Sequence, residues 1–128
     1  MADPGHRPVL LVLSAPTGGG KTTIARRLAS DDGRLRFSIS HTTRQPRPGE
    51  RDGVDYHFVT EEDFRARIGG GEFLEWAEVH DHLYGTHRSE LDAAAGRAED
   101  LLLDIDVQDG LQVKKAVPEA VLVFILPP

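Results

Sequence analysis

The sequence predicts an α/β protein with a parallel β-sheet core, helices on both faces of the sheet, and a small inserted α+β lobe. Three continuous apolar runs predict the sheet: VLLVL at residues 9–13, LLLDI at 101–105 and VLVFIL at 121–126. Such runs are typical of strands covered on both faces, as in parallel sheets. Helical segments connect them, and a strand-rich stretch separates the first run from the second. We therefore expect a core of residues 1–34 and 96–128 and a lobe of residues 35–95.

Local signals predict the remaining elements. A glycine-rich turn at 14–20 precedes a segment, 21–32, whose apolar residues share one helical face. The residues Thr60-Glu61-Glu62-Asp63 resemble a capping box, so a helix should begin there, and the three glycines at 69–71 should end it. Two-faced alternation at 72–79 favours a strand. We also expect strands at 37–43, 56–59 and 83–86, a loop at 44–53, and helices at 107–117 and at 89–95, the latter capped by Ser89.

The composition narrows the class of partner. The net charge is −6, but residues 1–54 hold nine Lys/Arg and five Asp/Glu, whereas residues 55–128 hold six and sixteen. A small basic cluster inside an acidic protein suits a phosphorylated small molecule, whereas a nucleic acid needs a broad basic face. We expect no membrane span, because no apolar run approaches 18 residues. The chain has no cysteine and no apolar leader before its first strand, which favours a cytoplasmic location.

A phosphate-binding loop, or P-loop, is predicted between the first strand and the first helix. It reads Ala15-Pro16-Thr17-Gly18-Gly19-Gly20-Lys21-Thr22, and this strand–loop–helix context is the one that the motif requires. Glycines let successive backbone N–H groups point at phosphate oxygens, and the helix adds its positive N-terminal end. Lys21 can bridge phosphate oxygens, and the Thr22 hydroxyl can join a Mg²⁺ shell. Ala15 replaces the first glycine of the usual pattern, which requires a negative φ there.

Two carboxylates end the second apolar run. In P-loop proteins an acidic residue at the end of a neighbouring parallel strand faces the Mg²⁺, so we assign Asp104 to the metal shell. Asp106 lies two residues further on, and strand alternation points it the same way. Because Mg²⁺ takes few protein carboxylates directly, Asp106 is left available for substrate. The alternative is that both carboxylates cap the following helix.

Further motifs resemble those of the guanylate kinase family. They are SISHTTRQPRPGE at 38–50, GVDYHFV at 53–59, FLEWA at 73–77, YGT at 84–86 and LDID at 103–106, in the same order as in that family. The resemblance runs from about residue 8 to the last residue. It implies a kinase that transfers the γ-phosphoryl group of ATP, with Mg²⁺, to GMP or dGMP.

The resemblance also implies roles for individual residues. Arg44, Arg47, Tyr56 and Tyr84 would hold the acceptor phosphate, to which guanidinium forks are well matched. Lys21 and Arg44 would supply catalytic positive charge. The remaining residues would recognise guanine: Glu75 accepting N1–H and N2–H₂, Ser40 donating to O6, Thr86 as a second hydroxyl, and Asp106 taking another N2 proton. Adenine presents the opposite pattern at that edge, so AMP would be rejected.

The same resemblance implies that the chain stops before the family's arginine-bearing lid and C-terminal segments. We therefore expect GMP binding but weak or absent kinase activity from these residues alone. Asp109 follows Gln108 where the family usually has glycine. Two other functions stay open: a non-catalytic guanylate-kinase-like module that holds phosphopeptides, although Lys21 and Thr22 are both in place, and a kinase of another small acceptor. The sequence leaves the oligomeric state undetermined.

Overall fold

The computed structural model describes residues 8–14, 27 and 33–124. Contacts divide the chain into two compact units. We call Ile39–Arg88 the insert unit, and Met1–Ser38 together with Ser89–Pro128 the core unit. The predicted helix at 21–32 lies almost wholly outside the described residues.

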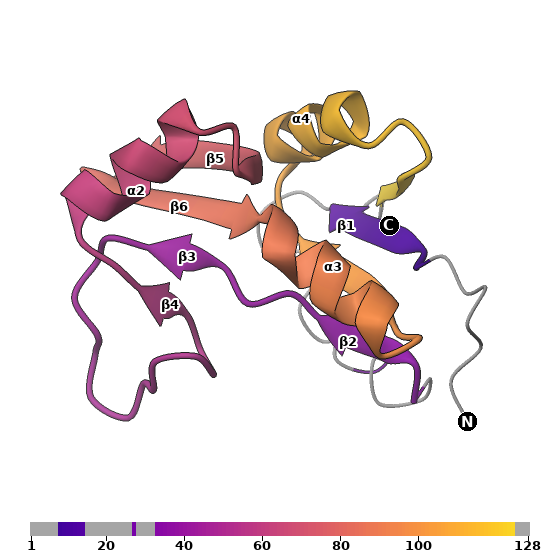
Figure 1. Cartoon of the computed structure of the whole chain (residues 1–128), viewed down its shortest axis with the longest axis horizontal. Helices are drawn as coiled ribbons and strands as arrows, with labels where there is room; N and C mark the ends of the chain where they lie inside the picture. The colour runs from indigo at the N-terminus through magenta and orange to yellow at the C-terminus, as the bar shows by residue number, and fades with distance from the viewer. Residues whose placement is uncertain (1–7, 15–26, 28–32, 125–128) are drawn as a thin grey trace, which may run out of the picture. The chain divides into compact units, whose positions relative to one another are not determined.

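The core unit contains the predicted parallel sheet. Its strands are β1 (Leu10–Ser14), β2 (Leu35–Phe37), β7 (Asp100–Asp104) and β8 (Val121–Phe124), in the spatial order β2-β7-β1-β8 (Figure 1). Every pairing is parallel, and Leu10 to Leu13 of β1 lie beside Leu101 to Asp104 of β7. The central strands are buried as their apolar runs predict, with Val12 and Leu102 at 0% exposure.

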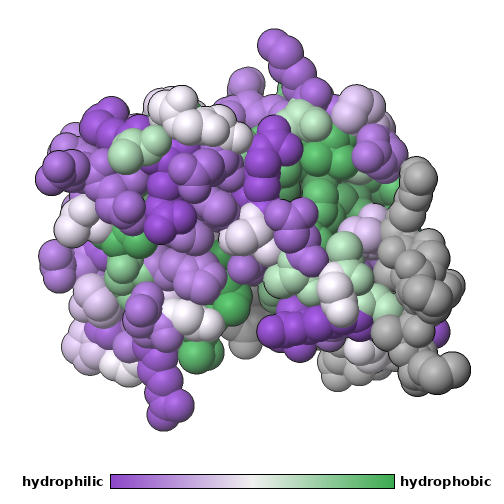
Figure 2. Space-filling model, viewed as in Figure 1, coloured by the Kyte–Doolittle hydropathy of each residue, from purple (hydrophilic) through white to green (hydrophobic). Residues whose placement is uncertain are grey.

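Two strand predictions need correction. The run at 37–43 is not one strand, because its beginning belongs to β2 in the core sheet and its end forms β3 (His41–Thr42) in the insert unit. The run at 121–126 was expected to be covered on both faces, but Val121, Val123 and Phe124 are 40–48% exposed. Among the described residues β8 pairs with β1 alone, and Figure 2 shows apolar side chains gathered around β8 and α4.

Two helices complete the described part of the core unit. These are α3 (Arg88–Gly96) and α4 (Val107–Ala116), so Ser89 lies inside α3 and does not cap it. Gly110 lets α4 approach the sheet closely, since a Cβ there would meet Val12 Cγ1 at 3.3 Å and Ser14 Oγ at 3.7 Å. None of the helices in the described ranges is long and apolar enough to cross a membrane.

The insert unit is built on a second sheet of order β4-β3-β6-β5. Besides β3 it contains β4 (His57–Phe58), β5 (Phe73–Val79) and β6 (His82–His87). The last two form an antiparallel hairpin in which Val79 pairs with His82. The turn between them is His80-Asp81, and both residues have positive φ, of 50° and 66°, as a two-residue type I′ turn requires.

A helix covers one face of this second sheet. It is α2 (Glu61–Gly69), and it begins and ends as predicted: the Thr60 hydroxyl accepts the Asp63 N–H at 3.1 Å, and Gly70 is the C-cap. Phe64 is fully buried and its ring stacks on that of Phe73 with centroids 4.4 Å apart. Figure 1 shows α2 beside β5 and β6, and Figure 2 shows its outer side to be mostly hydrophilic.

Candidate functional site

The predicted phosphate loop, Ala15 to Thr22, lies outside the described residues. The strand ends that flank it are described. Ser14 ends β1, and its hydroxyl donates to the Ile105 carbonyl oxygen at 2.6 Å. Leu13 pairs with Asp104. The end of β1 therefore lies beside the end of β7, which carries Asp104.

The second carboxylate of this pair has a structural role. Asp106 is the N-cap of α4, and its Oδ1 accepts the Asp109 N–H at 2.9 Å. Helix capping was the alternative left open for this residue, and it is the contact observed. Burial, followed by the nearby Asp106 carboxylate, raises the pKa of Asp109. Within the described ranges, no group of three or more His, Asp or Glu side chains is arranged to hold a metal ion.

Several predicted site residues lie on one face of the insert sheet. Residues paired across strands share a face, as do residues two apart along a strand. Glu75 pairs with Thr86, Ala77 with Tyr84, and Tyr84 with Thr42. Thr86, Tyr84 and Glu75 therefore point to the same side. His41 and its pairing partner Gly85 belong to the other side, where the His41 ring contacts Phe73 and Phe73 stacks on Phe64 of α2. The register thus separates a polar face from a core face.

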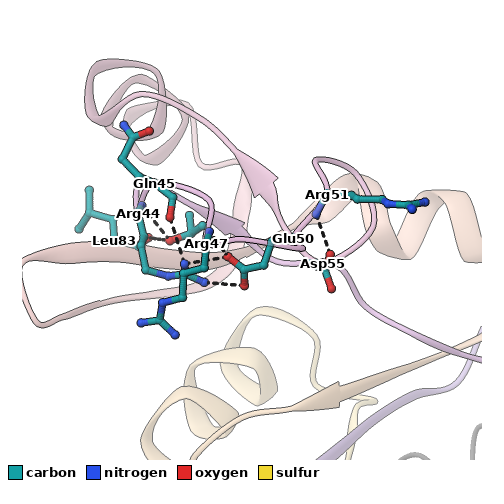
Figure 3. Close-up of polar contacts among 8 residues, drawn as sticks. Arg44, Gln45, Arg47, Glu50, Arg51, Asp55 and Leu83 are labelled. Atoms are coloured by element: carbon teal, nitrogen blue, oxygen red, sulfur yellow. Dashed lines mark hydrogen bonds and ion pairs between the residues drawn. The ribbon is translucent and has the colours of Figure 1, made fainter.

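Arg44 is the most tightly held cation of this unit. Its side chain is only 9% exposed. Nη1 donates to Glu50 Oε1 at 2.9 Å and to the Gln45 carbonyl at 3.0 Å, and Nη2 donates to Glu50 Oε2 at 3.0 Å (Figure 3). The paired guanidinium lowers the pKa of Glu50 to about 2, with the Arg47 backbone contributing next. The same pairing raises the pKa of Arg44.

Two tyrosines border this guanidinium. The Arg44 Cζ lies 5.2 Å from the centroid of the Tyr56 ring, within the range of cation–π attraction. The rings of Tyr56 and Tyr84 have centroids 6.1 Å apart in an edge-to-face arrangement. The neighbouring Tyr84 and Tyr56 hydroxyls further raise the pKa of Arg44, after the larger effect of Glu50. The structure therefore brings together three of the four side chains predicted to hold the acceptor phosphate.

Arg47, the fourth, differs from Arg44 in its exposure. It is exposed, and its backbone N–H donates to Glu50 Oε1 at 2.7 Å. The Glu50 N–H donates back to the Arg47 carbonyl at 3.0 Å, across a turn in which Gly49 has φ +87°. That φ is favourable for glycine and costly for most other residues. The turn thus ties the Arg47 backbone to the carboxylate that holds Arg44.

Glu75 is a buried carboxylate, 5% exposed, on the polar face. The Thr86 hydroxyl, 1% exposed, donates to Glu75 Oε1 at 2.7 Å. Gly85, between Tyr84 and Thr86, has no room for a side chain, because a Cβ there would lie 2.9 Å from the Glu75 carbonyl oxygen. A fixed carboxylate of this kind can accept two hydrogen bonds from a flat donor pair. Ser40 is half-buried, and its carbonyl accepts the His57 N–H at 2.8 Å.

Three residues that sequence reasoning gave no role help to build this site. Thr42 and Thr43 fasten the start of the arginine loop to β6: the Thr42 hydroxyl donates to the Leu83 carbonyl at 3.0 Å, and Thr43 exchanges two further bonds with Leu83. Glu50 is the third. The signal available in the sequence was an acidic residue between the arginines of a proline-rich basic loop, where it could pair with one of them.

A family model, curated sequences and a solved structure that resemble this chain all belong to one family. A family model described as guanylate kinase matches residues 7–128. The guanylate kinase of Myxococcus xanthus is 52% identical over 120 residues, covering 94% of this chain and 57% of that protein. The guanylate kinase of Thermus thermophilus is 52% identical over 124 residues, covering 97% and 55%. The crystal structure of guanylate kinase from Anaplasma phagocytophilum aligns with TM-score 0.74 and 35% identity, over 96% of this chain and 62% of that chain.

Proposed function

Because the chain belongs to the guanylate kinase family, we propose that it binds GMP or dGMP as acceptor for the γ-phosphoryl group of ATP, giving GDP or dGDP and ADP. The chain spans 57–61% of the length of the first curated relatives that it matches, so the proposal rests on the residues present here. The observation that carries it is the insert unit, which combines an arginine–tyrosine cluster with a buried carboxylate, Glu75, on a polar sheet face.

The arginine–tyrosine cluster supports a phosphate monoester as acceptor. Arg44 and Arg47 provide positive charge and planar donor forks, and the hydroxyls of Tyr56 and Tyr84 can donate further hydrogen bonds to an anion. The acceptor phosphate is itself the nucleophile, so the reaction needs no strong general base. Positioning and charge neutralisation would then provide most of the catalysis.

The carboxylate supports guanine as the base. Glu75 can accept N1–H and N2–H₂ together, and the Thr86 hydroxyl holds its orientation. Ser40 would donate a hydrogen bond to O6. Asp106 would accept one from N2 in addition to the bond by which it caps α4. Adenine lacks this donor pair and could not make the same two hydrogen bonds to Glu75, so a site arranged for guanine would disfavour it.

The donor side of the proposal rests on the sequence and on the core sheet. Residues 15–22 would bind the ATP phosphates, with Lys21 on the transferring group. The oxygen donors of Thr22 and Asp104 suit Mg²⁺, which favours oxygen and usually takes only one or two protein carboxylates. The metal would neutralise phosphate charge during transfer. The position of Asp104 beside the end of β1 is consistent with this assignment.

A binding series with matched variants tests the proposal. The dissociation constants of GMP, dGMP, AMP and UMP would be measured for the 128-residue chain and for Glu75→Gln and Glu78→Gln, two carboxylates on β5. We expect guanine nucleotides to bind best and Glu75→Gln to weaken them by about tenfold or more, while the exposed Glu78 has little effect. Equal affinity for GMP and AMP would contradict the guanine assignment. A coupled assay of ADP release then measures how much transfer the chain supports.

A further inference from the structure

Arg44 and Glu50 form a pair whose geometry leaves only one edge of the guanidinium for a ligand. A guanidinium has an end-on fork, made by Nη1 and Nη2, and a side-on fork, made by Nε and Nη2. Glu50 takes the end-on fork through both of its oxygens, and the Gln45 carbonyl takes the other hydrogen of Nη1. These hydrogen bonds take both hydrogens of Nη1 and one of Nη2. The side-on fork is the edge that remains for an anion, and the hydroxyls of Tyr84 and Tyr56, which border the same guanidinium, can donate to that anion as well.

Glu50 is also anchored from its own side. Its Oε1 accepts the Arg47 N–H at 2.7 Å, and its backbone N–H returns a bond to the Arg47 carbonyl at 3.0 Å. The Arg44 N–H donates to the Thr42 hydroxyl at 3.2 Å, which ties the other end of the loop to the sheet. The loop backbone holds the Glu50 carboxylate in place independently of Arg44, and that carboxylate in turn holds the guanidinium. The pair is therefore pre-organised.

We propose that Glu50 is a positioning residue, which fixes the guanidinium of Arg44 so that its side-on fork receives the acceptor phosphate. This inference rests on the proposed function for the identity of the phosphate, but not for the ordering of Arg44. A fixed guanidinium loses little conformational freedom when an anion arrives, whereas a free arginine loses most of its rotamer freedom at that moment.

For the Glu50→Gln variant, the proposal and simple electrostatics predict changes in GMP affinity of opposite sign. Glu50 carries a negative charge next to the cation that would hold a dianion. If it acted only through that charge, Glu50→Gln would remove a repulsion and tighten GMP binding. If it positions Arg44, the same substitution releases the side chain, and GMP binding weakens by about two- to tenfold, the ordering cost of one long side chain.

The first measurement compares GMP with guanosine, which lacks the phosphate, by NMR titration of the full 128-residue chain. We expect Glu50→Gln to weaken GMP and to leave guanosine unchanged, which also shows that the variant is folded. Glu62→Gln, an exposed carboxylate in the first turn of α2, is the matched loss of charge and should leave both ligands unchanged. Tighter GMP binding by Glu50→Gln, or equal weakening of both ligands, would overturn the proposal.

The second measurement needs no ligand. The Nε–H resonance of Arg44, identified by its loss in Arg44→Lys, should show restricted motion in the wild-type chain and fast motion in Glu50→Gln. Equal mobility in the two proteins would overturn the positioning role. If the wild-type chain bound no GMP while Arg44 was ordered by Glu50, the proposed function would fail and the positioning role would stand.

Discussion

The buried imidazole of His41 leads to a prediction about the acid stability of the insert unit. His41 is 7% exposed, and its ring centroid lies 4.7 Å from that of His57 and 5.1 Å from that of His87. Burial is the main cause that lowers the pKa of His41 from 6.5 to about 4. The charges of His57, His87 and Arg67 act in the same direction, and Asp63 opposes them.

The sign and size of the effect follow from proton linkage. Unfolded chains protonate His41 near pH 6.5, but folded chains do so only near pH 4. Between these values the unfolded state binds more protons, so the free energy of unfolding falls as the pH falls. The pKa difference of about 2.5 corresponds to about 3 kcal/mol in total, of which about 2 kcal/mol is lost by pH 5. Above pH 6.5 the contribution is fully present, and below about pH 4 it is gone.

Urea unfolding followed by tryptophan fluorescence measures this loss. Trp76 is the single tryptophan of the sequence and lies on β5, so it reports on the insert unit. Between pH 7 and pH 5 we expect the wild-type chain to lose about 2 kcal/mol more than His41→Leu, which cannot titrate. His80→Asn, in the exposed β5–β6 turn, should behave like the wild type. Equal losses in wild type and His41→Leu would refute the reasoning.

The same fluorescence assay at pH 7 checks one further stability prediction, and two others need probes of their own. Gly85→Ala places a Cβ against β5 and should cost about 1–3 kcal/mol, whereas Gly96→Ala in α3, with nothing within 4 Å, should not destabilise the core unit in thermal unfolding. Thr60→Ala removes the N-cap of α2 and should cost about 1 kcal/mol, measured by faster amide exchange in that helix. Arg36→Ala breaks an exposed ion pair with Glu99 and should change thermal stability by less than about 1 kcal/mol.

Local chemistry in the sequence predicted several elements well. The capping signal at Thr60 and the glycines after Ile68 placed both ends of α2, because caps are satisfied by residues close in the chain. The apolar runs placed β1 and β7 in a parallel sheet, since strands covered on both faces need continuous apolar sequence. The motifs of the insert unit indicated most of the side chains that the polar face now brings together.

The pairing of strands with one another could not be predicted from the local sequence. The run at 37–43 looks continuous, yet Leu35–Phe37 pairs with β7 while His41 and Thr42 pair with β6, and nothing within the run marks that change. The His80-Asp81 turn carries no glycine or asparagine, so the hairpin is set by the pairing of β5 with β6, which imposes positive φ on two ordinary residues. Glu50 was overlooked because its role depends on a bond across six residues of loop.

The short strand β3 explains why the two faces of the insert sheet depend on each other. It has two residues, and His41 points into the core beside α2 while Thr42 holds the arginine loop to Leu83 on the polar side. In a helix or a long strand, different residues on separate turns or pairs would face the core and hold the loop, whereas in β3 two adjacent residues do both. Here a charge on His41 would disturb the same backbone that carries Ser40 and leads to Arg44. We therefore expect protonation of His41 to weaken the polar face as well as the core of the insert unit.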